Sequence, residues 1–154
     1  MKILYCLLLM LSLLSTARAA TEEEAAATKA LNEYLAAVTE LDVPRAATFF
    51  HEPFFVVNAA ATRLLSNRSE IEAWIAPNYK ALKERNFARS EWAKLKVKSL
   101  GNGVVIASAL AIRYKQDGQE LQRLGVTYLM RKTVDGWKVA TLTNHDPANV
   151  LDLD

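Results

Sequence analysis

Four long strand-like segments in the second half of the chain constrain the fold more than any other feature. They are rich in β-branched and aromatic residues and cover residues 92–100, 104–116, 121–133 and 137–144. Short turns separate them, with the sequences Gly101-Asn102-Gly103, Asp117-Gly118 and Asp135-Gly136. Asn-Gly and Asp-Gly turns accept the positive φ angles of tight hairpins, so the sequence predicts four antiparallel neighbours.

Side chains alternate in size along the two central segments. In residues 104–116 one face holds Val104, Ile106, Leu110, Ile112 and Tyr114, and the other holds Ala107, Ala109, Ala111 and Arg113. In residues 121–133 the bulky face holds Leu124, Val126, Tyr128 and Met130. We expect the bulky faces of both strands to lie on the same side of the sheet.

Arg113 shares the small face of its strand with the three alanines. Its guanidinium could bind an anionic group of a ligand through two parallel hydrogen bonds. It could instead pair with a carboxylate across a dimer, because small alanines let two sheets approach closely. Both interpretations stay open, and the alanines favour the dimer.

The first half of the chain predicts helices. In residues 22–41 apolar side chains recur at helical spacing, and three glutamates at 22–24 stand where acidic residues favour the start of a helix. Asp42 and Pro44 suit the N-cap and first turn of a short second helix that continues through Phe50. Two helices are therefore expected before the first strand.

A phenylalanine-rich strand and a third helix come next. Residues 54–58 predict a buried strand. Asn67, with Glu70 three positions later, forms a capping-box pattern that begins the third helix. Pro77 is expected to kink or end that helix. Helices followed by a meander of strands indicate an α+β fold, with the helices covering one face of the sheet.

The N-terminus has the order of a secretory signal peptide. Lys2 precedes an apolar run at residues 3–14, and residues 15–19 supply small side chains at the cleavage positions. The apolar run is shorter than the roughly 20 residues that span a bilayer. We therefore expect cleavage of residues 1–19, no stable membrane anchor, and a secreted or periplasmic domain of residues 20–154.

Composition narrows the chemistry of this domain. The one cysteine, Cys6, lies in the signal peptide, so disulfides and thiolate sites are not expected. Loss of Lys2 and Arg18 lowers the basic count of 19 by two, which then equals the 17 acidic residues. A formally neutral domain does not suggest nucleic acid as a partner. With two histidines, we expect neither a metal site nor a cofactor.

Two local patterns give the chain a family resemblance. They are Tyr34-Leu35-Ala36-Ala37-Val38 with Asp42 and Phe49-Phe50 before a strand, and Tyr128-Leu129-Met130-Arg131 followed by Asp135-Gly136-Trp137-Lys138-Val139. With the order of helices and strands, they resemble the SnoaL-like branch of the nuclear transport factor 2-like superfamily over nearly all of residues 20–154. The resemblance implies a cone-shaped, curved antiparallel sheet around a pocket, N-terminal helices packed on its concave face, and a homodimer formed through the open sheet face.

Ketosteroid isomerase, a member of this superfamily, offers a comparison of single residues. The resemblance places its oxyanion-hole tyrosine at Tyr34, its general-base aspartate at Asn58 and the partner acid near Tyr128. An amide cannot take a proton at neutral pH, so the isomerase's own proton abstraction is not expected here. Tyr34 and Tyr128 could still donate hydrogen bonds to a developing negative charge.

His145 is the preferred candidate for a general acid or base. Strand alternation places it on the same face as Trp137, which is expected to point toward the wide end of the cone, and Asp146 lies beside it to orient the ring. The alternative is that residues 144–147 form a strand-ending turn that satisfies its own backbone.

Four aromatic residues are candidates for the pocket lining, with core packing as the alternative: Phe54, Trp74, Tyr79 and Trp137. Together with Asn58 they favour an exported protein that binds a small apolar organic molecule. The first alternative function is an isomerase, dehydratase or hydrolase that uses His145 as its acid or base. The second is a non-catalytic dimeric interaction module, whose cone is filled by its own side chains.

Overall fold

The computed structural model describes the backbone of residues 2–153 and the side chains of residues 20–153. Its elements are α1 (Lys2–Thr39), α2 (Val43–Ala47), β1 (Phe50–Val57), β2 (Thr62–Leu65), α3 (Arg68–Glu84), β3 (Phe87–Gly101), β4 (Val104–Lys115), β5 (Glu120–Thr133), β6 (Gly136–His145) and a 3-10 helix, η1 (Pro147–Asn149). The predicted signal peptide lies outside the residues whose side chains are described. None of the described helices is long and apolar enough to span a membrane.

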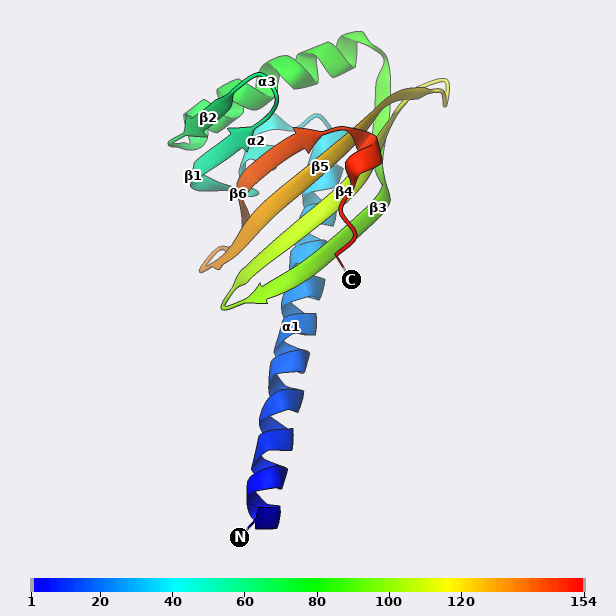
Figure 1. Cartoon of the computed structure of the whole chain (residues 1–154). Coiled ribbons are helices and arrows are strands. Elements are labelled where there is room, and N and C mark those ends of the chain that lie inside the picture. Colours follow the sequence, from blue (N-terminus) through cyan, green and yellow to red (C-terminus); the bar gives the residue numbers. More distant parts are fainter. Residues whose placement is uncertain (1, 154) are drawn as a thin grey trace.

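The described strands form a curved sheet in the order β2-β1-β6-β5-β4-β3 (Figure 1). The neighbours from β3 to β6 pair antiparallel, as the hairpin turns predicted. β1 pairs parallel with β6, so the sheet is mixed, and the predicted all-antiparallel sheet is wrong in this one pairing. The α+β class and the curved sheet are confirmed. Local patterns cannot reveal the parallel pairing, because β1 and β6 are far apart in the sequence.

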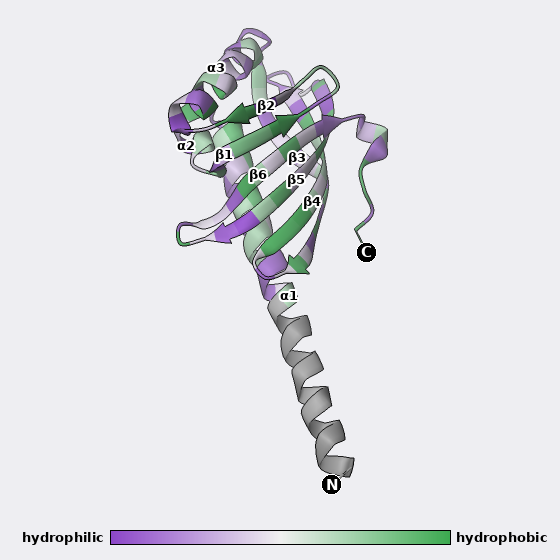
Figure 2. Ribbon diagram, turned by 60° about the vertical axis from the view of Figure 1, so that its left-hand side comes forward, coloured by the Kyte–Doolittle hydropathy of each residue, from purple (hydrophilic) through white to green (hydrophobic). Residues whose placement is uncertain are grey.

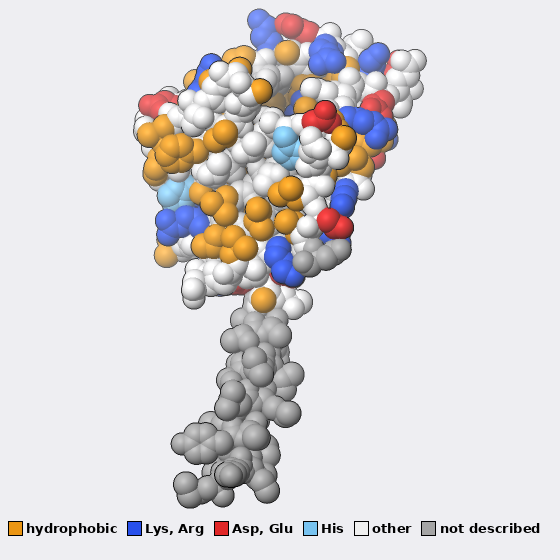
Figure 3. All heavy atoms as spheres, viewed as in Figure 1, with side chains coloured by type: hydrophobic (Ala, Val, Ile, Leu, Met, Phe, Trp, Pro, Cys, Tyr) orange, Lys and Arg blue, Asp and Glu red, His pale blue; other side chains and the backbone are white. Residues whose placement is uncertain are grey.

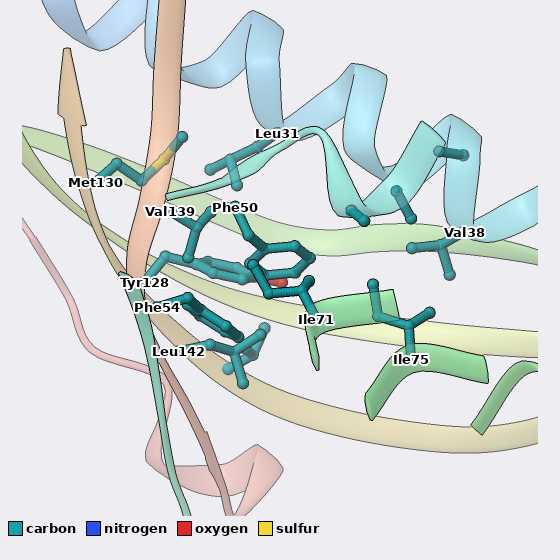
Figure 4. Close-up of a cluster of buried hydrophobic side chains, with 14 of the residues drawn as sticks. Leu31, Val38, Phe50, Phe54, Ile71, Ile75, Tyr128, Met130, Val139 and Leu142 are labelled. Carbon is teal, nitrogen blue, oxygen red and sulfur yellow. The ribbon is translucent and has the colours of Figure 1, made fainter. Parts of the chain in front are cut away.

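The core lies between the helices and the concave face of the sheet. We call this face the inner face and the opposite one the outer face. Figure 4 shows side chains of α1, α3 and the strands β1, β5 and β6 meeting there, among them Leu31, Val38, Phe50, Phe54, Ile71, Ile75, Tyr128, Met130, Val139 and Leu142. Along the strands, hydrophobic stretches alternate with hydrophilic ones (Figure 2), as expected when one face is buried. The predicted packing of helices on the concave face is therefore present.

The pairing of β4 with β5 places the alanines on the inner face. Ala107 lies opposite Tyr128 and Ala109 lies opposite Val126, and both alanines are fully buried. The bulky faces of the two strands thus point to opposite sides of the sheet, and the prediction that they share a side is wrong. Small side chains on β4 leave room for α1 and for the larger residues of β5. Because this chain itself covers the alanine face, the dimer contact predicted there is also wrong.

Both predicted helix caps form. The Asp42 carboxylate accepts a hydrogen bond from the Arg45 backbone N–H at 3.0 Å, and the Asn67 side-chain oxygen accepts one from the Glu70 N–H at 3.1 Å. The helix ends differ from the predictions. α2 ends at Ala47, and β1 begins at Phe50, the residue through which the second helix was expected to continue. α3 continues through Pro77, which lies at an exposed position where water can satisfy the carbonyl left without a partner.

Two glutamates attach α1 to the hairpin between β3 and β4. The sequence predicted that these glutamates would lie in the first turn of the helix, but helical backbone already begins at Lys2. The Glu23 carboxylate accepts hydrogen bonds from Ser99 Oγ at 2.6 Å and from the Gly103 N–H at 3.0 Å. Glu24 accepts one from the Ser99 N–H at 2.9 Å. Their role in this structure is to fix α1 to the edge of the sheet.

Candidate functional site

A cavity of about 500 Å³ lies between α1, α3 and the inner face of the sheet. Its walls come from α1, α3 and the strands β3 to β6, and the space-filling view shows a recess with hydrophobic walls beside α3 (Figure 3). The lining residues Asn58, Asn78, Ala81, Arg85 and Asn144 are exposed, and so they mark its mouth. The cavity lies within the range of about 300 to 1,000 Å³ that is typical of small-molecule sites.

Five of the eight predicted site residues line this cavity: Tyr34, Asn58, Trp74, Tyr79 and Tyr128. Phe54 and Trp137 do not; they are buried in the hydrophobic core, with exposed fractions of 0% and 7%. For these two aromatics, the core-packing alternative holds. His145 is also absent from the lining.

His145 lies on the outer face because β6 contains a β-bulge. Val139 pairs with Met130, whereas Thr141 pairs with Leu129, so Ala140 is an extra residue between them. A bulge shifts the alternation of side chains by one residue. Trp137 and Val139 therefore point inward before the bulge, and Leu142 and Asn144 do so after it. The prediction that His145 shares a face with Trp137 is wrong.

The His145 ring has a well-defined set of partners outside the cone. Nε2 lies 3.0 Å from Thr127 Oγ1, and Nδ1 lies 3.0 Å from the Asp146 carbonyl oxygen. A carbonyl oxygen can only accept, so Nδ1 donates. The ring also lies over Gly125, where an added Cβ would come within 2.6 Å of Nδ1. The Asp146 carboxylate, predicted to orient the ring, instead accepts a hydrogen bond from the Ala148 N–H in η1 at 2.8 Å.

Tyr34 and Tyr128 meet at the inner wall, as the family resemblance implied. Their ring centroids lie 6.4 Å apart in an edge-to-face arrangement, and Trp92 contacts Tyr128 in the same way at 6.4 Å. Burial raises the pKa of Tyr34 to about 12 and raises the pKa values of Tyr79 and Tyr128 above their usual range. At neutral pH all three hydroxyls are therefore protonated and can donate hydrogen bonds.

Arg113 reaches the cavity from β4. Its Nη1 donates to the Gln122 side-chain oxygen at 3.2 Å, while Nε is buried without a hydrogen-bond partner. Burial lowers the pKa of Arg113, and the nearby hydroxyls of Tyr34 and Tyr79 act in the opposite direction. The sequence had allowed a ligand contact for this residue but favoured the dimer. Because the alanine face is the inner face, Arg113 lines the cavity, and a ligand contact there stays a prediction.

Asn58 lies at the mouth and has a structural task. Its side-chain oxygen accepts hydrogen bonds from the N–H groups of Ala60 and Ala61, at 2.9 and 3.0 Å, and so holds the turn between β1 and β2. Sequence reasoning missed Trp92 and Asn144 as lining residues. Bulges in β3 and β6 set which side chains point inward, and strand alternation alone cannot locate them. Among the described residues, no three His, Cys, Asp or Glu side chains gather as a metal site would require.

Comparison with solved structures finds the same fold at low sequence identity. An NTF2-like protein with a cystatin-like fold from Novosphingobium aromaticivorans superposes with a TM-score of 0.70 at 16% identity, covering 92% of this chain and 90% of that one. An NTF2-like protein of unknown function from Pseudomonas putida KT2440 gives 0.64 at 17% identity, covering 87% and 91%. An uncharacterised protein with a cystatin-like fold from Caulobacter vibrioides gives 0.62 at 18% identity, covering 86% and 92%.

The comparison with curated proteins finds no match. The comparison with protein families matches residues 22–147 to the family described as NTF2-like protein (DUF6841). That match includes every residue that lines the cavity, and it agrees with the resemblance inferred from the sequence. The chain therefore belongs to the NTF2-like family DUF6841.

Proposed function

We propose that this protein binds a small, largely apolar organic molecule in the cavity of the cone. The observation that carries the proposal is the cavity itself, about 500 Å³ in volume and open at one end. Aromatic and aliphatic side chains form most of its wall, including Trp74, Trp92 and Leu124. Burial of an apolar ligand against such a wall removes apolar surface from water, which favours binding.

The two alternatives find less support in the geometry. The enzyme hypothesis depended on His145, and its ring contacts Thr127 on the outer face. The tyrosines that do reach the cavity have raised pKa values, so they are hydrogen-bond donors rather than bases at neutral pH. The interaction-module hypothesis required a cone filled by its own side chains, and this cone has an open cavity. We further propose that the protein acts after export, on the strength of the signal-peptide pattern in residues 1–19.

A neutral fluorescent probe tests the proposed function. N-phenyl-1-naphthylamine fluoresces strongly when it leaves water. Trp74 and Trp92 line the cavity, so they are close enough to transfer excitation to a bound probe molecule. We expect saturable binding to the purified protein, with quenching of tryptophan emission. Ala111, which lines the cavity and is 5% exposed, is the site for a filling variant. Ala111→Trp should reduce probe binding at least tenfold.

Two further variants complete this experiment. Ala81→Trp fills the mouth from an exposed position on α3. It therefore tests the cavity even if Ala111→Trp fails to fold. Ala93→Trp adds the same side chain at an exposed position of β3 outside the cavity and should bind the probe as the unmodified protein does. Probe binding that both cavity variants leave unchanged would overturn the proposed function.

A further inference from the structure

We infer that the ligand of this cavity is a small organic carboxylate, whose acid group is held by Arg113 and whose apolar body lies against the aromatic wall. The inference deepens the proposed function and rests on it. Arg113 and Arg85 both line the cavity, and the described lining residues include no aspartate or glutamate. The cavity thus carries positive charge without an internal counter-ion.

The Arg113 guanidinium lacks the partners that a buried cation normally has. Its one hydrogen bond to a side chain goes to the neutral amide of Gln122, and its Nε is buried with no partner among the described residues. Buried charges in proteins are usually paired, because removing them from water is costly. An anionic group that entered the cavity would supply the missing charge and accept the unused N–H.

Two further donors point to the same kind of ligand group. Tyr79 Oη and Trp92 Nε1 both belong to residues that line the cavity, and both atoms are buried without a partner. A protonated phenol, an indole N–H and a guanidinium N–H can all donate. A carboxylate offers two oxygens with several acceptor sites and matches the planar fork of an arginine. The unused donors therefore select an acceptor-rich, planar anion.

The rest of the wall sets the nature of the ligand's body. Leu35, Val38, Leu124 and Leu142 give apolar contacts, and Trp74 adds a flat aromatic surface. Arg113 is a half-buried cation inside the cavity and Arg85 lies exposed at the mouth, so one negative charge would balance the inner cation. The ligand class is accordingly a monocarboxylic acid with an apolar or aromatic body.

Calorimetric titration with a matched pair of probes tests this inference. Phenylacetate carries the carboxylate, and phenylacetamide has the same shape without the charge. We expect the purified protein to bind phenylacetate at least tenfold more tightly. Arg113→Gln should abolish this preference while leaving binding of the neutral naphthylamine probe intact. Arg113→Lys, which keeps the charge but loses the planar fork, should give an intermediate preference.

Arg123→Gln is the control, since it removes the same charge from an exposed arginine that hydrogen-bonds Glu120 at 2.7 Å. It should bind phenylacetate as the unmodified protein does. Thermal unfolding gives a second readout: phenylacetate should raise the Tm of the unmodified protein but not of Arg113→Gln. Equal affinity for acid and amide, or a preference that survives Arg113→Gln, would overturn the carboxylate inference. In that case, binding of the neutral probe would still support the proposed function. If the protein bound neither phenylacetate nor the neutral probe, both the carboxylate inference and the proposed function would be refuted.

Discussion

At the scale of single residues, three buried phenols interact with one guanidinium. Tyr34, Tyr79 and Tyr128 each act to raise the pKa of Arg113, and burial is the main cause of their own raised pKa values. A buried phenol with a raised pKa is uncharged at neutral pH. The inner wall can therefore donate hydrogen bonds without adding negative charge that would compete with a ligand for Arg113.

These phenols predict a loss of stability at alkaline pH. A tyrosine whose folded pKa is raised contributes fully to stability below its unfolded value near 10, and the contribution is lost as the pH rises through the folded pKa, about 12 for Tyr34. Urea unfolding at several pH values should show the free energy of unfolding falling above about pH 10. Tyr34→Phe should reduce the size of that fall. If tyrosinate absorbance showed that all tyrosines ionise near pH 10 in the folded protein, burial would not raise the pKa values of these phenols.

Residue patterns predicted five of the residues that line the cavity, whereas Phe54, Trp137 and His145 lie outside it. Tyr34, Trp74, Tyr79 and Tyr128 were found because helix spacing and family resemblance place them without reference to bulges. His145 was misplaced because Ala140 adds one residue to β6, and nothing in its own sequence separates a bulged alanine from a paired one. A bulge is defined by the partner strand, so local alternation cannot locate it.

At the scale of elements, the link between α1 and the β3–β4 hairpin holds the N-terminal wall of the cavity in place. Glu23 contributes two of the three hydrogen bonds in this link, to Ser99 and Gly103. Tyr34, Leu35 and Val38 follow on the same helix and line the cavity. The position of α1 on the sheet therefore determines the shape of the site.

Replacement of Glu23 tests the importance of this link. Glu23→Gln keeps the size of the side chain but removes its charge, and hydrogen bonds to charged groups contribute about 1.5 to 3 kcal/mol each. We expect the free energy of unfolding, measured by urea denaturation, to fall by about 1 to 3 kcal/mol. Glu33→Gln, at an exposed position on the same helix, is the matched control and should change it by less than about 0.5 kcal/mol. Equal effects of the two substitutions would show that the link does not stabilise the fold.

Elements defined by local chemistry were the most predictable. The capped helix at Asn67 and the hairpins of β3 to β6 follow from short sequence signals. β2 was missed because its four residues are mostly exposed and show no alternation. The parallel pairing of β1 with β6 was missed for a different reason, since it depends on contact between distant segments.

At the scale of the whole molecule, the two faces of the sheet have separate roles. The inner face lines the cavity. The outer face carries the C-terminal segment, where the Leu151 N–H donates to Ser108 Oγ at 3.0 Å and Asp152 lies 3.7 Å from Lys94. Hydrophobic side chains also gather on the outer face (Figure 3), and Ile106 lies there opposite Leu129, which is 40% exposed.

The homodimer implied by the family resemblance stays a prediction, and this outer patch is where we propose that it forms. Leu129→Glu would place a charge at the centre of such a contact, where it would be costly to bury. Sedimentation velocity should detect a dimer of the unmodified protein and a monomer of Leu129→Glu. Val134→Glu, in the exposed turn between β5 and β6, should stay dimeric. A monomeric unmodified protein, or a dimer that survives Leu129→Glu, would contradict this proposal.

The proposed binding of a small organic acid in the open cavity of the cone can be observed in a crystal. The experiment is a crystal structure of the purified protein grown with phenylacetate. We expect the phenyl ring to lie among the side chains of the inner wall, near Trp74, with the carboxylate within hydrogen-bond distance of Arg113. A cavity closed by its own side chains, with Arg113 paired to a carboxylate of the protein, would contradict the proposed binding.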